Sequence, residues 1–488
     1  MTSVTFPTSL GGSGVTISDD ADPSTGLLNG GHRDRFVPAL KGTVDMAQYV
    51  YQYAAKIDGA AEDAERAENA RGYVEAYAGA LKNNLHQYYG QFATLGLNFA
   101  RGKYLVDDGE LSETTNASEI LSVVRASPKW VEGPNGYLRE VAPNTIARQW
   151  RNGVCQGALI EEERTNLLLW SEDFTNAVWS KSGVMISNDA AVGPDGTMSA
   201  DKIIPDATGG RYVVQAVEVA DNTTCIFSVF AKAAEYNSIR LNARDKSGSY
   251  QSGFFNLVTG IGEHVAVTGE RLAGGWWKVS LRVESVAGTA PPAFYLYPAD
   301  DGVVAQGGDG TSGIYIWGAQ LEEGGQPSSY ISTTDTPVTR AADNISRELG
   351  GDYNQGAGTV FVEFHTDRIY NLVGTIWEAN VDNNNRVGIY HDSNGNIFTR
   401  VRNDGVNYDT PSKLYAVGKN RAALSFQDGE PSILAVNGAT AAGPVADIPT
   451  VTTEGITGNG GALFVGTKSV ITRLPFSVSD AELAEKTQ

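Results

Sequence analysis

Ten Asp-Gly or Asn-Gly pairs between residues 108 and 438 constrain the fold more than any other feature of this sequence. Both residues of such a pair tolerate a positive φ, so each pair favours the tight turn of a β-hairpin. The chain has 56 glycines among its 488 residues, which gives it many sites where its direction can reverse. The ten pairs begin at Asp108, Asn135, Asn152, Asp195, Asp301, Asp309, Asn394, Asp404, Asp428 and Asn437.

Short runs between these turns alternate apolar and polar residues. Ile239, Leu241 and Ala243 alternate with polar neighbours, and the same period recurs over residues 294–297 and 360–365. A period of two places successive side chains on opposite faces of a strand. We therefore predict a mainly β fold, with two antiparallel β-sandwich domains of the jelly-roll or laminin-G-like kind.

Residues 46–88 follow another pattern, in which apolar positions step by three and four. This spacing is typical of an α-helical coiled-coil stalk. Three glycines in the segment weaken a helix, so an antiparallel hairpin of two amphipathic helices is the alternative. The core positions of a self-associating rod would be Val50, Tyr53, Ile57, Ala60, Ala64, Ala67, Val74, Leu81 and Leu85.

Composition shifts along the chain predict its domain boundaries. Turn residues dominate before the helical segment, and a Gly- and Ser/Thr-rich stretch separates the two β-domains. The tail reads as a short helix with Ser479 or Asp480 as its N-cap. We expect an N-terminal segment over 1–42, a stalk over 43–90, a connecting β-rich region over 91–164, a jelly roll over 165–335, a linker over 336–355 and a second sandwich over 356–488.

The charge balance excludes several classes of partner. The chain carries 57 acidic and 37 basic side chains, a formal net charge of −20, which argues against nucleic acid and anionic membrane surfaces. It contains no apolar run of about 18 residues and no recognisable secretory signal, so we expect no membrane insertion. Cys155 and Cys225 lack metal-ligand spacing, so we predict no metal and no cofactor.

Catalytic patterns are weak in this sequence. None of its five histidines lies in a nucleophile-elbow context, and no G-x-S-x-G occurs. Two carboxylates would suffice for a glycosidase, and Glu161, Glu162 and Glu163 form the densest cluster, but their apolar neighbours indicate a structural segment. Oxygen-rich turns near Asp382 could suit calcium, yet hairpin turns use the same residues. We expect a binding protein and no enzyme.

A mixed aromatic and cationic strand face is the candidate sugar-binding surface. In residues 275–284, Trp277, Val279, Leu281 and Val283 share one strand face, which reads as core. The opposite face would suit a sugar ring, although Trp276 would equally suit a sandwich edge or a subunit contact. Tyr295 and Tyr297 either extend that face or belong to the core of the opposite sheet. The glycan-binding candidates are Trp276, Lys278, Arg282, Tyr295, Tyr297, Arg240 and Arg244.

Two long segments resemble parts of a module frequent in bacteriophage fibre and spike proteins. GALIEEERTNLLLWSEDFTNAVWSKSGV, residues 157–184, resembles the module's leading segment, and GAQLEEGGQPSSYISTTDTPVTRAAD, residues 318–343, resembles its closing segment. GGWWKVSLRV matches its strand pattern. Residues from 358 onward are similar to laminin-G-like or concanavalin-like sandwiches, and residues 4–40 look like the attachment region of such appendages.

This resemblance implies a structural virion appendage of a bacteriophage, such as a tail fibre or receptor-binding protein, assembled in the host cytoplasm. It implies a carbohydrate-binding-like jelly roll, a homotrimeric stalk, host-surface glycans as ligands, and tail, portal or capsid proteins as partners. A head fibre or capsid spike is the alternative within the class, and a polysaccharide-degrading tailspike is the alternative outside it. The docking candidates in the N-terminal segment, which could instead form a self-packed cap, are His32, Arg33, Arg35 and Phe36.

Overall fold

The structure, a computed structural model, divides into two units, Met1–Phe92 and Ala93–Gln488. In the first unit, β1 (Ser3–Thr5) pairs antiparallel with β2 (Thr16–Ser18). The predicted stalk and the docking candidates lie outside the described residues, so both stay predictions. The structure describes residues 3–5, 16–18, 93–107, 111–206, 210–263, 266–305, 308–366, 373–457 and 464–488.

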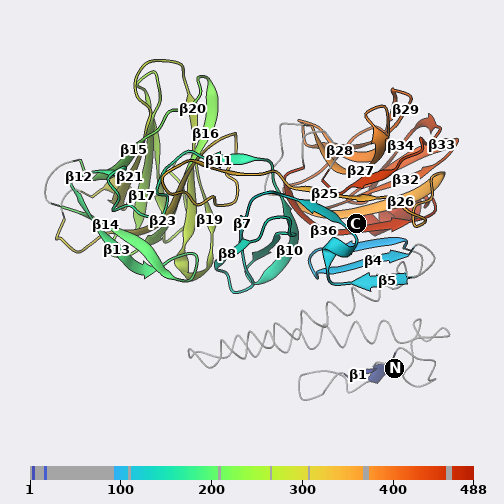
Figure 1. Cartoon of the computed structure of the whole chain (residues 1–488), viewed down its shortest axis with the longest axis horizontal. Coiled ribbons are helices and arrows are strands. Elements are labelled where there is room, and N and C mark those ends of the chain that lie inside the picture. Colours follow the sequence, from blue (N-terminus) through green and yellow to red (C-terminus); the bar gives the residue numbers. More distant parts are fainter. Residues whose placement is uncertain are drawn as a thin grey trace. The chain divides into compact units, whose positions relative to one another are not determined.

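The first sandwich consists of two six-stranded antiparallel sheets (Figure 1). Side chains such as Phe227, Leu241, Leu281 and Leu296 fill the core between them. One sheet, called here the β17 sheet, contains in spatial order β12 (Ser180–Ser182), β15 (Tyr212–Ala216), β21 (Ala293–Asp300), β17 (Ser238–Arg244) and β18 (Tyr250–Asn256), with β22 (Val303–Val304) beside β21. The other, the β16 sheet, contains β13 (Val184–Val192), β14 (Met198–Pro205), β23 (Ile314–Glu323), β16 (Thr223–Ala233), β20 (Trp277–Ser285) and β19 (Val267–Arg271).

The second sandwich has larger sheets around a core that includes Phe364, Trp377 and Ile471. Its ten-stranded sheet contains β34 (Ala439–Ala446), β33 (Glu430–Val436), β32 (Gly418–Gln427), β26 (Ala357–Thr366), β36 (Gly466–Leu474), β3 (Leu95–Asn98), β4 (Lys103–Asp107) and β5 (Leu111–Thr114), with β10 (Val154–Ile160) on β36 and β9 (Arg148–Arg151) on β10. Its eight-stranded sheet contains β30 (Val406–Asp409), β29 (Asn396–Asn403), β28 (Asn385–His391), β27 (Gly374–Asp382), β35 (Thr453–Gly455), β25 (Asn344–Glu348) and β6 (Ser122–Val124), with β31 (Lys413–Leu414) on β29.

Strands from the expected connecting region and linker belong to these sheets. β3 and β10 both pair with β36, and β6 pairs with β25, so much of 91–164 forms part of the second sandwich. The segment 336–355 contains β25 and also β24 (Val338–Arg340), which pairs with β11 (Arg164–Asn166). The expected linker therefore differs from the structure. Its Gly and Ser/Thr content predicted a linker, but Ile345 is buried in the core of the second sandwich.

The turn prediction is confirmed over most of the described chain. Eight of the nine described Asx-Gly pairs join strands that pair antiparallel, and the pair at Asp309 is the exception. Both residues of the pair have positive φ at Asn152, Asp301, Asp404 and Asn437, the conformation that such pairs favour.

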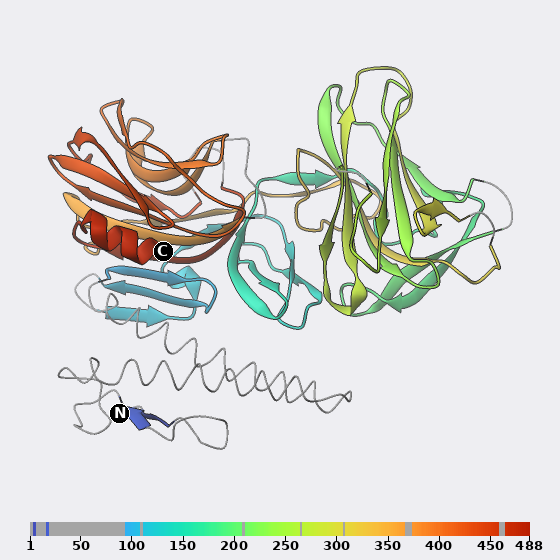
Figure 2. The ribbon, with the colours of Figure 1, turned by 180° about the vertical axis from the view of Figure 1, so that it is seen from behind.

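Short elements complete the described chain. α3 (Asp480–Thr487) follows Ser479 as N-cap, as expected, and lies against β33 (Figure 2). β7 (Lys129–Glu132) and β8 (Leu138–Val141) form a hairpin, and 3-10 turns span Ala117–Glu119 and Ala273–Gly275. Among the described helices, none has the length and hydropathy of a membrane span.

Candidate functional site

The outward face of the β17 sheet carries a cluster of aromatic side chains. Along β17, Ile239, Leu241 and Ala243 are fully buried in the core, so the residues between them point to the other side of the sheet. Strand pairing then places outward residues of β15, β21 and β18 next to them. We call this surface the tyrosine face, and its residues are Tyr212, Arg240, Asn242, Arg244, Tyr250, Ser252, Phe254, Tyr295 and Tyr297.

Four tyrosine rings form one contiguous cluster on the tyrosine face. The Tyr212 ring centroid is 5.2 Å from that of Tyr295 and 5.3 Å from that of Tyr297. Tyr295 and Tyr297 are stacked with their centroids 6.1 Å apart, and Tyr250 is 6.2 Å from Tyr295. Tyr250 is 57% exposed, whereas the other three are half-buried. Pairing of β15 and β18 with the strands between them holds the rings in place before any ligand arrives.

Arg240 and Arg244 flank these rings. The Arg240 guanidinium carbon lies 5.3 Å from the centroid of the Tyr297 ring and 5.6 Å from that of Phe254, close enough for cation–π attraction. Its Nη2 donates to Ser252 Oγ at 3.0 Å. Arg244 donates through Nε and Nη2 to the Pro291 carbonyl at 3.1 and 2.8 Å. Neither guanidinium forms an ion pair with a described carboxylate, and each retains N–H donors for another partner.

Asn242 lies between the two arginines on β17 and holds an unused acceptor. Its side chain is only 4% exposed, yet its Oδ1 accepts no hydrogen bond from any described residue. Burial raises the pKa of the Tyr297 hydroxyl, and a hydrogen bond from Asn242 partly offsets that rise. Burial and a hydrogen bond with Tyr250 likewise raise the pKa of Tyr295. Both phenols are therefore neutral donors near pH 7.

The prediction that Trp276 and Lys278 lie on an exposed sugar-binding face is wrong. Trp276 is 1% exposed, packs with Phe230, Trp317 and Tyr330, and donates from Nε1 to the Val192 carbonyl at 3.2 Å. Lys278 is also buried; it donates to the Ser328 carbonyl, and burial lowers its pKa.

The reason for this error is that other segments cover the outer side of the β16 sheet. Trp130 and Leu138 of the β7–β8 hairpin pack on the Trp276 cluster, with the Trp130 and Trp317 ring centroids 6.1 Å apart. Arg282 alone of the three candidates is exposed, where it pairs with Glu284 at 2.7 Å. Of the predicted core residues on the opposite side of β20, Val279, Leu281 and Val283 are confirmed as buried, whereas Trp277 is half-buried and packs against the same core.

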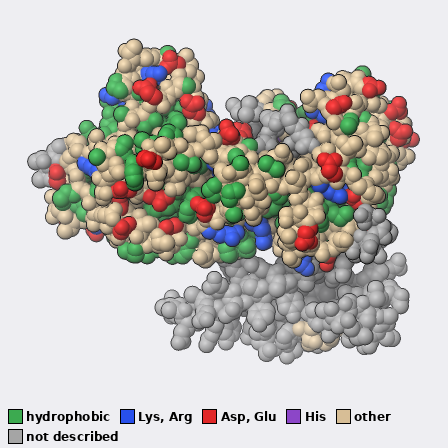
Figure 3. All heavy atoms as spheres, in the orientation of Figure 1, with side chains coloured by type: hydrophobic (Ala, Val, Ile, Leu, Met, Phe, Trp, Pro, Cys, Tyr) green, Lys and Arg blue, Asp and Glu red, His purple; other side chains and the backbone are tan. Residues whose placement is uncertain are grey.

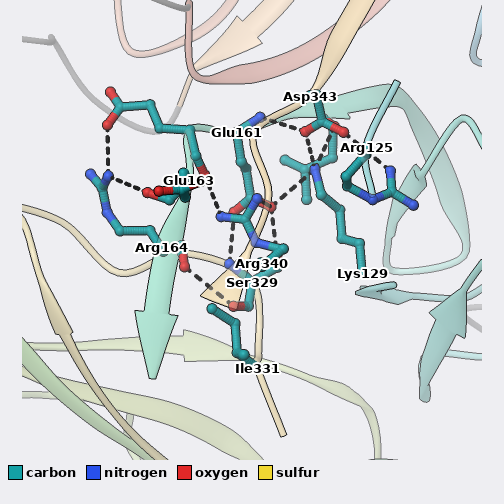
Figure 4. A network of polar contacts seen from close by, with 12 residues as sticks. Arg125, Lys129, Glu161, Glu163, Arg164, Ser329, Ile331, Arg340 and Asp343 are labelled. Atoms are coloured by element: carbon teal, nitrogen blue, oxygen red, sulfur yellow. Dashed lines mark hydrogen bonds and ion pairs between the residues drawn. The ribbon is translucent and has the colours of Figure 1, made fainter. Parts of the chain in front are cut away.

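The Glu161–Glu163 cluster contributes to a buried polar network (Figure 4). Glu161 accepts from Ser329 N and Oγ, both at 2.7 Å, and lies 3.2 Å from Lys129 Nζ. Lys129 also pairs with Asp343, which is 3.1 Å from Arg125. Burial by itself would raise the pKa of Glu161, but Arg340, Lys129 and the Ser329 bonds hold it well below its usual value. A permanently ionised, buried carboxylate of this kind ties segments together and is unsuited to general acid catalysis.

The Asp382 side chain, in the oxygen-rich turn, accepts hydrogen bonds from backbone N–H groups of the same turn. Its Oδ1 accepts from Asn384 N at 2.7 Å and from Asn385 N at 2.8 Å, which is the hydrogen bonding of an Asx turn. Within the described ranges, no group of three or more His, Cys, Asp or Glu side chains has metal-binding geometry. Acidic side chains are spread over the described surface in the view of Figure 3.

Sequence reasoning therefore found four of the nine residues of the tyrosine face. It proposed Tyr295, Tyr297, Arg240 and Arg244, and the structure brings all four together; that they bind a glycan stays a prediction. It missed Tyr212, Tyr250, Phe254, Asn242 and Ser252. The alternating pattern of β17 and β21 was the only available signal, because the pairing of β15 with β21 joins positions about 80 residues apart in the chain.

Comparison with known proteins gives distant structural neighbours. No protein-family model and no curated protein matches the chain. The Ruminococcus gnavus IT-sialidase CBM40 bound to alpha2,3 sialyllactose has 19% identity and a TM-score of 0.25, over 28% of this chain and 84% of that one. Domain 4 of a Geobacillus stearothermophilus GH43 arabinanase, in complex with arabinotriose, has 14% identity and a TM-score of 0.27, over 34% and 82%.

A third neighbour is the botulinum neurotoxin type G receptor-binding domain, with 10% identity and a TM-score of 0.23, over 30% of this chain and 39% of that one. Each of these likenesses covers about a third of this chain or less. At such TM-scores none of them carries weight for function, which has to be inferred from this chain's own residues.

Proposed function

We propose that this chain is a glycan-binding protein and that the tyrosine face is its binding surface. The observation that carries the proposal is the cluster of four tyrosine rings on one sheet face, flanked by the guanidinium groups of Arg240 and Arg244. Aromatic side chains gathered on a surface, with polar groups beside them, are typical of a binding site.

The chemistry of the tyrosine face matches that of a sugar. A sugar ring presents C–H groups on its faces and hydroxyls around its rim, so it suits an aromatic surface with a few fixed polar groups. Tyr295 and Tyr297 offer the aromatic surface. Ser252 and the free N–H groups of the arginines surround it with polar partners. Because strand pairing fixes these side chains, little ordering entropy opposes binding.

The wider role that we propose is a bacteriophage virion appendage that displays this face to the host surface. Support comes from the resemblance of residues 157–184 and 318–343 to phage fibre modules and from the heptad spacing over 46–88. A homotrimer would present three tyrosine faces at once, and such avidity can exceed single-site affinity by about 10² to 10⁴. Immunogold labelling of phage particles tests this role, since the proposal requires label on a tail or head fibre.

Binding of the full chain to an array of bacterial surface polysaccharides tests the glycan proposal itself. The variant Tyr295→Ala/Tyr297→Ala should lose at least about tenfold in affinity, the usual consequence of removing central aromatic contacts. Tyr315→Ala is the matched control, because Tyr315 is a half-buried tyrosine beside Lys202 on the β16 sheet. Equal binding by the double variant and wild type would refute the proposed surface.

A further inference from the structure

We infer that the glycan recognised by the tyrosine face is anionic and that Arg240 and Arg244 bind its charged groups. This inference rests on the proposed function and narrows it to a substrate class. Its starting point is the contrast between the tyrosine face and the rest of the chain, whose formal net charge is −20.

The tyrosine face is free of carboxylates along its central strands. Outward positions alternate with core positions on β15, β21, β17 and β18, all of which are described, and none of these outward positions is Asp or Glu. The charged residues at outward positions on these four strands are Arg240 and Arg244. A chain with 20 more acidic than basic side chains therefore leaves a positively charged patch here, which attracts anions and repels cations.

Both guanidinium groups are positioned but not neutralised. Arg240 is fixed by the Tyr297 and Phe254 rings and by Ser252, and Arg244 is fixed by the Pro291 carbonyl. Elsewhere in the described structure, arginines such as Arg400 are matched by bidentate carboxylates, with both Arg400–Asp409 distances at 2.7 Å. The planar guanidinium suits carboxylate and phosphate oxygens equally, so the shared chemistry is an oxyanion on a sugar.

The spacing of the arginines indicates a polymer. Arg240 and Arg244 are four residues apart on one strand, which places their Cα atoms roughly 13 Å apart at about 3.3 Å per residue. Tyr295 and Asn242 lie opposite each other in the β17–β21 register, between the two arginines along the strand. A chain of several sugars with charged groups at intervals would contact both arginines and stack on the tyrosines between them.

Paired polysaccharides test this inference on the full chain. Uronic-acid polymers are offered in native and carboxyl-reduced form, and polysaccharides that carry phosphate monoesters on their sugars are offered before and after phosphatase treatment, so that the polymer backbone is the same within each pair. We expect binding to native polymers of one or both kinds, at least about tenfold weaker binding to the neutral counterpart, and weakening by added salt. The two arms identify carboxylate or phosphate as the anion.

The variants separate this inference from the proposed function. Arg240→Gln/Arg244→Gln should lose at least about tenfold in affinity for the native polymer, whereas Arg240→Lys/Arg244→Lys should keep part of it. Arg271→Gln, at an exposed arginine that lies over the Trp277 ring on the β16 sheet, should bind like wild type. Equal binding to charged and neutral polymers would overturn the inference and leave the tyrosine face as a glycan site. Binding to no polymer of either charge would overturn both.

Discussion

Asn242 lies directly opposite Tyr295 in the register of β17 and β21, with its carboxamide oxygen buried and unpaired. Asn242 also hydrogen-bonds the Tyr297 hydroxyl. An apolar replacement of similar shape therefore removes an unsatisfied acceptor and one hydrogen bond together, and these two effects on stability oppose each other.

Asn242→Leu should therefore change the free energy of unfolding by less than about 1 kcal/mol. Because Oδ1 is buried, the variant should also keep its affinity for the polysaccharide within about threefold of wild type. Urea denaturation and a polysaccharide-binding titration measure the two quantities. A loss of more than about tenfold in affinity would show that Asn242 itself contacts the ligand.

Trp276 is expected to contribute to the stability of the fold and not to glycan binding. Truncation of a fully buried tryptophan costs about 3–5 kcal/mol, and Trp276 packs among Phe230, Trp317 and Tyr330. Trp276→Ala should thus lower the free energy of unfolding by about that amount, measured by urea denaturation. The folded fraction should bind glycan as wild type does. If Trp276→Phe stayed fully stable but lost binding, the covered position of this side chain would be in doubt.

The network around Lys129 should be intolerant of losing one member. Asp343 pairs with both Lys129 and Arg125 and accepts from Glu161 N at 2.9 Å. Asp343→Ala leaves buried positive charge uncompensated, so we expect a loss of about 3–5 kcal/mol in denaturation experiments. Asp335→Ala, at an exposed site in the same stretch of chain, should change stability by less than about 0.5 kcal/mol. A similarly small change at Asp343 would contradict the network's structural role.

Lys468 predicts a pH dependence of stability. Burial lowers its pKa to about 7, and its ammonium donates to the carbonyls of Ile376 and Ile456. In the unfolded chain a lysine has a pKa of about 10.4, so between pH 7 and 10 the unfolded state binds more protons. The free energy of unfolding should therefore rise with pH across this window through Lys468.

Lys468→Met should remove that contribution, and the exposed Lys103→Met should leave the pH profile unchanged. Urea denaturation at pH 6, 7, 8, 9 and 10 gives the slopes. Burial of the charged ammonium destabilises the wild type most at low pH. The free energy of unfolding of Lys468→Met, relative to that of wild type, should therefore be highest near pH 6. Parallel profiles for wild type and Lys468→Met would show that this lysine does not titrate in the window.

Local features of the sequence predicted much of the fold. The turn at Asn437-Gly438 and the short helix after Ser479 depend on neighbouring residues, so they were predictable without knowledge of the rest of the chain. The period of two likewise placed Leu241 in the core and Arg240 outside it. Such a period indicates that one face of a strand is apolar and the other polar.

The sequence does not show which segment of the chain covers a given face of a strand. Trp276 and Tyr295 both read as outward aromatics, but the β7–β8 hairpin covers Trp276 and leaves Tyr295 half-exposed. The same limit explains the linker, because Ile345 is buried only through the pairing of β25 with β6 and β35. Both outcomes depend on contacts between residues distant in sequence.

A crystal structure of the full chain with an oligosaccharide from the best-bound polysaccharide is the most direct test of the central claim. The account predicts sugar rings against Tyr295 and Tyr297 and an anionic group on Arg240 or Arg244. Ordered sugar bound elsewhere, with the tyrosine face empty, would contradict it.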